Sequence, residues 1–148
     1  MASGLNDFPR RMSRRAKNVI TNADALVRRC ALATDAAVVL ATPVDTGRAR
    51  ANWQVEINSP SVSTTTNTSK SGRESINAGK VAIAQYKGGT PNAAIYITNN
   101  LPYIGKLNDG SSAQAPAGFV ERGVMIGVRA VHTGGGLVSK QVSRADPI

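Results

Sequence analysis

The chain has 148 residues, close to the usual size of one domain, and 41% of them are hydrophobic while 18% are charged. This balance excludes an intrinsically disordered protein. Because only 4% of the residues are aromatic, the core must be built mainly from Ala, Val, Leu and Ile. Eighteen Lys and Arg residues against nine Asp and Glu residues give a net charge of +9, so we expect the protein to attract polyanions.

The chain has too few cysteines, histidines and long apolar runs for a disulfide-bonded protein, a zinc protein or a membrane-spanning protein. Cys30 is the only cysteine and His132 the only histidine, which excludes an internal disulfide framework and a conventional zinc centre. No apolar run approaches the roughly 20 residues that cross a bilayer. The N-terminal arginines are not followed by the apolar segment of a signal peptide. We expect a protein made in the cytoplasm, with no membrane, metal or cofactor partner.

The first predicted element is a helix over residues 9–42. Asp7 offers an N-cap, and Pro9 suits the first turn, where its missing N–H is not needed. Apolar residues then recur in steps of three and four, which indicates one stripe on a helix. They are Phe8, Met12, Val19, Ala23, Leu26, Cys30, Ala33, Ala37 and Leu40. Several are small, so another backbone can approach closely, and Pro43 ends the helix at Thr42.

A helix turns by about 100° per residue, which places a series of cations on the side opposite the apolar stripe. That side is therefore strongly basic. Its cations are Arg10, Arg11, Arg14, Arg15, Lys17, Arg28 and Arg29. A solvated face is the plainer interpretation of such a run. The functional interpretation is a surface that faces DNA or an acidic protein partner. These seven residues are our candidates for that surface.

The segment after the helix combines turn chemistry with two arginines. Asp45, Thr46 and Gly47 predict a structural turn, because Asp can bond the backbone two residues on and Gly permits positive φ. Arg48 and Arg50 are candidate subunit-interface residues, since Arg can bridge to a neighbour's carboxylate. A strand then begins near Trp53, where apolar and polar residues alternate, and Trp53 itself is expected to anchor the core.

Residues 59–71 are almost entirely Ser, Thr, Asn and Pro, which predicts a mobile loop or a weak hairpin. Ser71 and Glu74 then have the spacing of a capping box, which opens a helix to about Tyr86. A second strand is predicted over 93–98 and a short helical turn over 103–107. A last helix runs from Pro116 to a triple glycine, and residues 134–148 form a flexible tail.

These elements predict an α+β fold in a single domain covering residues 1–148. In that fold a long N-terminal helix and one or two further helices pack on a small antiparallel sheet.

The sequence offers little for catalysis. Cys30 lies on the apolar stripe and His132 lies beside the triple glycine, so the pair does not indicate a catalytic dyad. The acids Asp45, Asp109 and Glu121 are isolated, and no glycine-rich phosphate loop follows a strand. We predict no catalytic residues and no enzyme. No signature of sequence-specific nucleic-acid reading is present either, which leaves sequence-independent phosphate contact as the alternative function.

Two segments resemble a known family. The segment TPVDTGRAR at 42–50, between a long helix and Trp53, resembles the PVDTG-x-x-R signature of tailed-phage neck and tail-completion proteins. This broad family includes the lambda-like minor tail protein Z. The segment IYITNNLPY at 95–103, with Leu107, Gly110-Ser111 and QAPAGFV at 114–120, resembles the family's second run in order and spacing. Asn108-Asp109 departs from the acidic residue and aromatic expected there.

The resemblance implies a structural virion protein at the head–tail junction. Such proteins form homo-oligomeric rings that join the portal or connector to the tail and surround the DNA channel. The implied partners are other copies of the chain, other neck, connector or tail proteins, and non-specifically the genomic DNA. Connector, tail-completion and tail-terminator positions all stay open. A ring subunit needs no active site, but it does need surfaces that become ordered on assembly.

Overall fold

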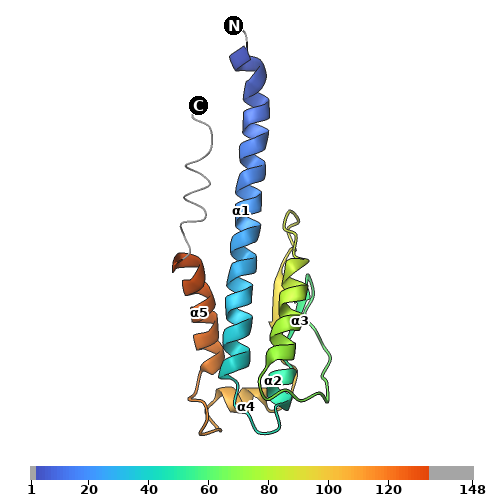
Figure 1. The fold of residues 1–148 in the computed structure, drawn as a ribbon, viewed down its shortest axis with the longest axis vertical. Helices are drawn as coiled ribbons and strands as arrows, with labels where there is room; N and C mark the ends of the chain where they lie inside the picture. The colour runs from blue at the N-terminus through green and yellow to red at the C-terminus, as the bar shows by residue number, and fades with distance from the viewer. Residues whose placement is uncertain (1–2, 134–148) are drawn as a thin grey trace.

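Helix α1 (Ser3–Ala41) spans 39 residues and forms the long axis of the molecule (Figure 1). The computed structural model describes residues 3–133. The helix ends at Ala41, as predicted from Pro43, but it begins earlier than expected. Pro9 lies inside the helix and not in its first turn, so Asp7 is not the N-cap. A proline removes one main-chain hydrogen bond, and so long a helix tolerates that loss.

The remaining elements gather around the C-terminal half of α1 (Figure 1). In chain order they are α2 (Arg48–Ala51), β1 (Gln54–Ile57), α3 (Arg73–Ala84), β2 (Ile95–Thr98), α4 (Ile104–Asn108) and α5 (Phe119–Thr133). The strands pair antiparallel, with Val55 opposite Ile97 and Ile57 opposite Ile95. The predicted α+β class is confirmed: a long helix with further helices and a two-stranded sheet in one domain.

The core lies where α1 meets β1 and α5. Its buried residues are Val38, Val39, Trp53, Ala115 and Phe119. Trp53 is 7% exposed, and its indole Nε1 donates to Thr42 Oγ1 at 2.7 Å. The Thr42 hydroxyl in turn donates to the Val38 carbonyl at 2.6 Å. The expected anchor role of Trp53 is therefore confirmed, and its polar edge is satisfied by the end of α1.

Helix α5 runs antiparallel along the C-terminal half of α1 (Figure 1). Two glycines make this contact close. A Cβ on Gly127 would overlap Thr34 Oγ1 and lie 3.0 Å from the Cys30 carbonyl, and one on Gly123 would overlap the Val38 side chain. The close backbone approach predicted from small residues on α1 thus depends equally on glycines of α5, one turn apart.

Helix α3 packs on another side of α1. The Arg28 guanidinium donates to the Tyr86 carbonyl through Nε at 3.2 Å and Nη2 at 2.8 Å. The Gly88 N–H donates to Asp24 Oδ2 at 3.2 Å. These bonds hold the C-terminal end of α3 against the middle of α1. Helix α3 and strand β2 match the predicted helix that ends at about Tyr86 and the predicted strand over 93–98 to within a few residues.

The start of α3 differs from the predicted capping box. Ser69, not Ser71, is hydrogen-bonded to the Glu74 carboxylate, and its Oγ also accepts the Gly72 N–H at 3.0 Å. Gly72 is the N-cap residue, with φ of 75°. Ser71 Oγ accepts the Arg73 N–H instead, at 3.3 Å. The chain reaches α3 through a left-handed glycine, which shifts the serine that can reach Glu74 by two positions.

Residues 59–71 contain no helix or strand, as their composition predicted. Side-chain amides nevertheless tie this loop to the body. Asn52 accepts the Thr65 N–H at 2.8 Å and donates to the Thr65 carbonyl at 3.0 Å, as a neighbouring strand would. The mobility of the loop stays a prediction, but its path has specific partners. The predicted triple-glycine helix end and the tail at 134–148 lie outside the described residues.

Within residues 3–133, no helix is both long and apolar enough to span a membrane.

Candidate functional site

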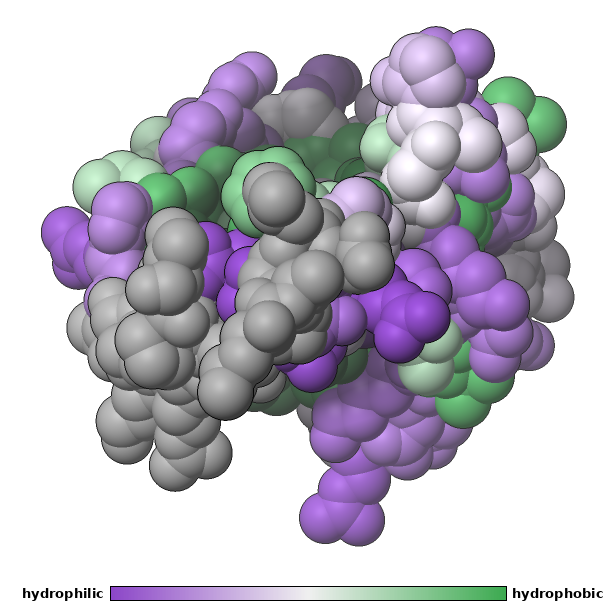
Figure 2. All heavy atoms as spheres, turned by 90° about the horizontal axis from the view of Figure 1, so that it is seen from above, coloured by the Kyte–Doolittle hydropathy of each residue, from purple (hydrophilic) through white to green (hydrophobic). Residues whose placement is uncertain are grey.

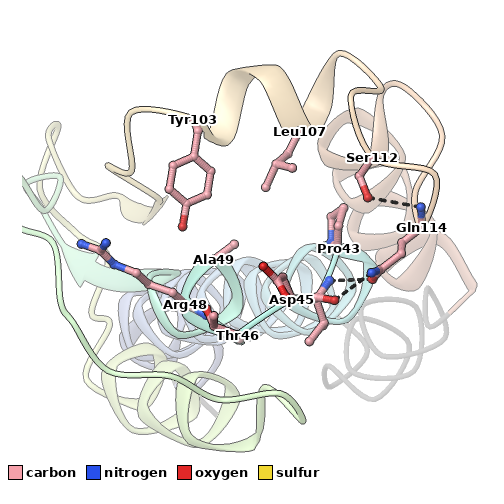
Figure 3. Close-up of a pocket in the computed structure, with 11 residues that line it drawn as sticks. Pro43, Asp45, Thr46, Arg48, Ala49, Tyr103, Leu107, Ser112 and Gln114 are labelled. Carbon is pink, nitrogen blue, oxygen red and sulfur yellow. Dashed lines mark hydrogen bonds between the residues drawn. The ribbon is translucent and has the colours of Figure 1, made fainter.

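A hollow of about 260 Å³ lies between the turn that follows α1 and the start of α4 (Figure 3). Pro43 and Val44 line one wall, and Tyr103 and Leu107 extend from the opposite side. The Arg48 side chain lies at one end of the hollow (Figure 3). The hollow therefore has mixed walls, in which apolar side chains alternate with polar and charged ones.

Gln114 joins the two segments that carry the phage-family resemblance. The Val44 N–H donates to Gln114 Oε1 at 2.8 Å, and Gln114 Nε2 donates to the Val44 carbonyl at 2.8 Å. Ser112 Oγ accepts the Gln114 N–H at 3.2 Å (Figure 3). Residues 70 positions apart in the chain thus form one reciprocal amide pair. The two segments are parts of a single structural unit.

The predicted turn is present, although its parts differ from those expected. Gly47 has φ of 90° and precedes α2, and a Cβ there would lie 2.6 Å from the Ser69 carbonyl carbon. Glycine is therefore required. Thr46 Oγ1 accepts the Arg48 N–H at 3.3 Å. The Asp45 side chain is exposed and makes no hydrogen bond to the described residues. The expected bond from Asp45 to the backbone two residues on is therefore absent.

Arg50 acts inside the chain. Its Nε donates to the Thr42 carbonyl at 3.0 Å, its Nη2 to the Leu40 carbonyl at 2.7 Å and its Nη1 to the Lys70 carbonyl at 2.7 Å. The guanidinium therefore caps the C-terminal end of α1, where cations are favoured. Nothing in these contacts directs Arg50 to a neighbouring subunit. The sequence signal for this role was an arginine that follows shortly after the end of a helix, where the last carbonyls lack partners within the helix.

Arg48 is the more available of the two interface candidates. Its side chain is half-buried, lines the hollow and donates from Nε to the Thr65 carbonyl at 3.5 Å. This long bond connects the wall of the hollow to loop 59–71.

The structure divides the basic face of α1 into two parts. Arg10, Arg11, Arg14, Arg15 and Lys17 lie in the N-terminal half, which projects beyond the other elements (Figure 1). Arg28 and Arg29 lie in the packed half, and Arg28 binds the Tyr86 carbonyl. Arg10, Arg14 and Lys17 are exposed. The fully exposed cations of the predicted face therefore lie in its N-terminal part.

The apolar stripe of α1 is divided in the same way. Phe8, Met12 and Val19 are 53%, 49% and 60% exposed, whereas Cys30 and Ala37 are half-buried. The predicted stripe is wrong at its C-terminal end, where Leu40 is 54% exposed and the buried residues are Val38 and Val39, which lie outside the stripe. The view along the long axis shows hydrophobic and hydrophilic surface side by side (Figure 2). Exposed apolar residues in a row, flanked by cations, are typical of a surface that binds a partner.

Asn108, which departs from the family pattern, has a local role. Its Oδ1 accepts the Val120 N–H at 2.9 Å in the first turn of α5. Its Nδ2 donates to both Glu121 carboxylate oxygens, at 3.1 and 3.0 Å. The Glu121 pKa is lowered first by a bond to its own backbone N–H and then by Asn108. An asparagine can both accept from the helix and donate to an acid, which an acidic residue cannot do when ionised.

Sequence reasoning missed one buried acid, Asp35. It is 2% exposed, lies on α1 against Gly79 of α3, and its Oδ1 has no hydrogen-bond partner among the described residues. Burial raises the pKa of this carboxyl to about 7. The available signal was its position one turn from both Ala31 and Val39, which places it on a packed face.

The described residues contain no group of three or more His, Cys, Asp or Glu side chains that could hold a metal ion. Cys30 is half-buried in the α1–α5 contact and His132 is exposed near the end of α5.

Comparison of the chain with protein-family models, with curated proteins and with solved structures finds no match.

Proposed function

We propose that this chain is a structural virion protein of a tailed phage, and that copies of it form a ring at the head–tail junction. The observation that carries the proposal is the reciprocal Gln114–Val44 amide pair. It joins the PVDTG segment to the QAPAG segment, the two parts of the chain that resemble the neck and tail-completion family. Motifs that meet in space are more informative than the same motifs scattered over a surface.

The distribution of surface supports an assembly role. The N-terminal half of α1 projects beyond the other elements with Phe8, Met12 and Val19 exposed, and an apolar row of this kind favours contact with a partner. The turn after α1 is closed by the Arg50 cap and by Gly47, so its geometry is fixed before any partner arrives. A fixed body with a projecting helix is the form expected of a subunit in a closed assembly.

Sequence-independent DNA binding is the second candidate. Arg10, Arg14 and Lys17 are exposed on the projecting half of α1, within about two turns of each other. In the ring, this face would lie near the DNA channel or against acidic neighbours. As a separate function, it would act on duplex DNA away from particles. Binding driven by phosphate contacts weakens steeply with added salt.

Gene deletion with complementation tests the proposal. Without the protein, we expect full heads and separate tails that do not join, and joining should return when the wild-type chain is supplied. Heads and tails that join normally without it would contradict the proposal. Duplex binding by the isolated monomer that is independent of salt would contradict the DNA role.

A further inference from the structure

Val62 is the most exposed of the large hydrophobic side chains in the described residues, at 92%. Scattered exposed apolar residues are ordinary, so exposure alone carries no inference. Val62 differs because of how its two neighbours are held. It lies in loop 59–71, which contacts the body through Ser61 on one side of Val62 and Ser63 on the other.

Gln54 and Asn100 grip both neighbours of Val62. Ser61 Oγ donates to Gln54 Oε1 at 2.7 Å, and Gln54 Nε2 donates to the Ser63 carbonyl at 2.9 Å. Asn100 Nδ2 donates to the Ser61 carbonyl at 2.8 Å and to the Ser63 carbonyl at 3.0 Å. The backbone is thus ordered on both sides of a side chain that contacts almost nothing. A group ordered in advance loses little entropy when it binds.

The surroundings of Val62 are electrically neutral. From Asn58 to Ser69 the chain has no charged residue, although the whole chain carries +9. Two copies of so basic a protein repel each other over most of their surface. This segment can approach a second copy without bringing cations together.

The hollow beside the PVDTG turn is the matching surface on the same chain. Its apolar walls include Val44 and Leu107, and its volume of about 260 Å³ is ample for a valine side chain. Its two charged lining groups, Asp45 and Arg48, have opposite signs, so it is also close to neutral. The chain therefore carries an ordered apolar projection and a partly apolar hollow whose two charged groups offset each other.

We propose that Val62 of one copy inserts into the hollow beside the PVDTG turn of the next copy. The contact is heterologous, because projection and recess are different surfaces, and such contacts close into rings when the rotation between copies permits. This inference rests on the proposed function and specifies its partner: the occupant of the hollow is a second copy of this chain.

Three variants of the full chain test the contact. Val62→Ser removes the projection, and Asp45→Arg places a long cation in the hollow at a position whose side chain is exposed. Val81→Ser is the matched control, since Val81 is a 68%-exposed valine on α3. Urea unfolding of each variant verifies folding. The mass of the assemblies is measured by native mass spectrometry over a concentration series.

We expect Val62→Ser and Asp45→Arg each to weaken self-association by tenfold or more, on the order of the loss of an interface anchor. Val81→Ser should assemble as the wild type does. Mixing Val62→Ser with Asp45→Arg should give heterodimers and nothing larger, because only one intact contact can form. Wild-type assembly by Val62→Ser, or large assemblies in the mixture, would overturn the proposal.

A photo-crosslinking group at position 62 gives an answer even if Asp45→Arg fails to fold. In a mixture of light and heavy isotope-labelled wild-type-like chains, we expect crosslinks between chains that map to 43–49 or 103–114. Crosslinks between chains that map elsewhere, or to another virion protein in particles, would overturn this inference and leave the ring intact. If Val62→Ser particles assemble normally while deletion still separates heads from tails, this contact fails and the proposed function stands.

Discussion

The two halves of α1 belong to one continuous helix and have opposite surroundings. In the packed half Val38 and Val39 are 1% and 0% exposed, whereas Phe8 and Val19 in the projecting half are more than half exposed. Length explains the difference: 39 residues of helix extend about 58 Å, whereas the 15 residues of α5 cover about 22 Å. The packed half of α1 builds the fold, and we propose that the projecting half binds a partner. Changes in the packed half should therefore alter stability, and changes in the projecting half should alter assembly alone.

The largest effect is expected at Asp35 in the packed half. Its folded-state pKa is raised from 3.8 to about 7 by burial, so the folded protein keeps a proton that the unfolded chain releases near pH 4. Stability from this group is complete below pH ~4 and is lost as the pH rises to ~7, by about 4 kcal/mol in total. Asp35→Asn should abolish that slope, as measured by urea unfolding between pH 4 and pH 8.

The wild type and Asp35→Asn must be compared directly, because Glu74 and Glu121 also make the stability depend on pH. The pKa of each is lowered, that of Glu74 mainly by its bond with Ser69, so their contributions are lost as the pH falls. These contributions act in the opposite direction and are the same in both chains. Equal pH slopes for the wild type and Asp35→Asn would show that Asp35 does not hold its proton.

The next largest effect is expected at Gly127. A side chain there would overlap Thr34 and approach the Cys30 carbonyl, which separates α5 from α1. Gly127→Leu should cost about 3 kcal/mol of unfolding free energy, a typical cost of overpacking. Gly105→Ala is the control, because a Cβ there meets nothing within 4 Å. Equal midpoints of urea unfolding for the two variants would contradict the close α1–α5 packing.

Arg50→Lys should have an intermediate effect. Lysine cannot reproduce three hydrogen bonds to the carbonyls of Thr42, Leu40 and Lys70, so we expect a loss of about 2 kcal/mol. Thermal or urea unfolding measures it, with Arg73→Lys at an exposed position as the control. Full stability with impaired assembly would instead favour the subunit-interface role expected from the sequence.

The smallest effect on stability is expected in the projecting half. Phe8→Ser with Met12→Ser should change the unfolding free energy by less than about 0.5 kcal/mol, because both side chains are already half exposed. The same pair should reduce self-association, which sedimentation velocity detects. A clear loss of stability in the monomer would show that this part of α1 belongs to the fold after all.

The local pattern predicted most of the fold. Pro43 gave the end of α1, the alternation around Trp53 gave β1, and the small residues of α1 indicated a close helix contact. The pattern failed where the local structure depends on the positive φ of a glycine or on a residue that is distant in the sequence. The capping serine of α3 was misplaced because Gly72 turns the chain, and Pro9 was placed in the first turn of a helix that in fact begins at Ser3. The absence of regular structure in loop 59–71 followed from its composition, but its anchoring by Asn52, Gln54 and Asn100 depends on residues that meet only after folding.

The candidate site was predictable in its segments and not in its contacts. The family resemblance drew attention to 42–50 and 95–120, but nothing local indicated that Gln114 would pair with Val44. The role of Arg50 changed because three carbonyls come within its reach once the chain turns at Gly47. The seven cations of α1 were predicted as one face, and only the length of the other elements divides them between a packed and a projecting part.

The most direct test of the proposed ring is a cryo-electron microscopy reconstruction of the neck of the phage particle to which we propose that this chain belongs. The account predicts a closed ring of copies between portal and tail, coaxial with the DNA, with the packed body of each subunit as described and the projecting half of α1 against a neighbour or the channel. A neck fully accounted for by other proteins, with this chain absent from the particle, would contradict it.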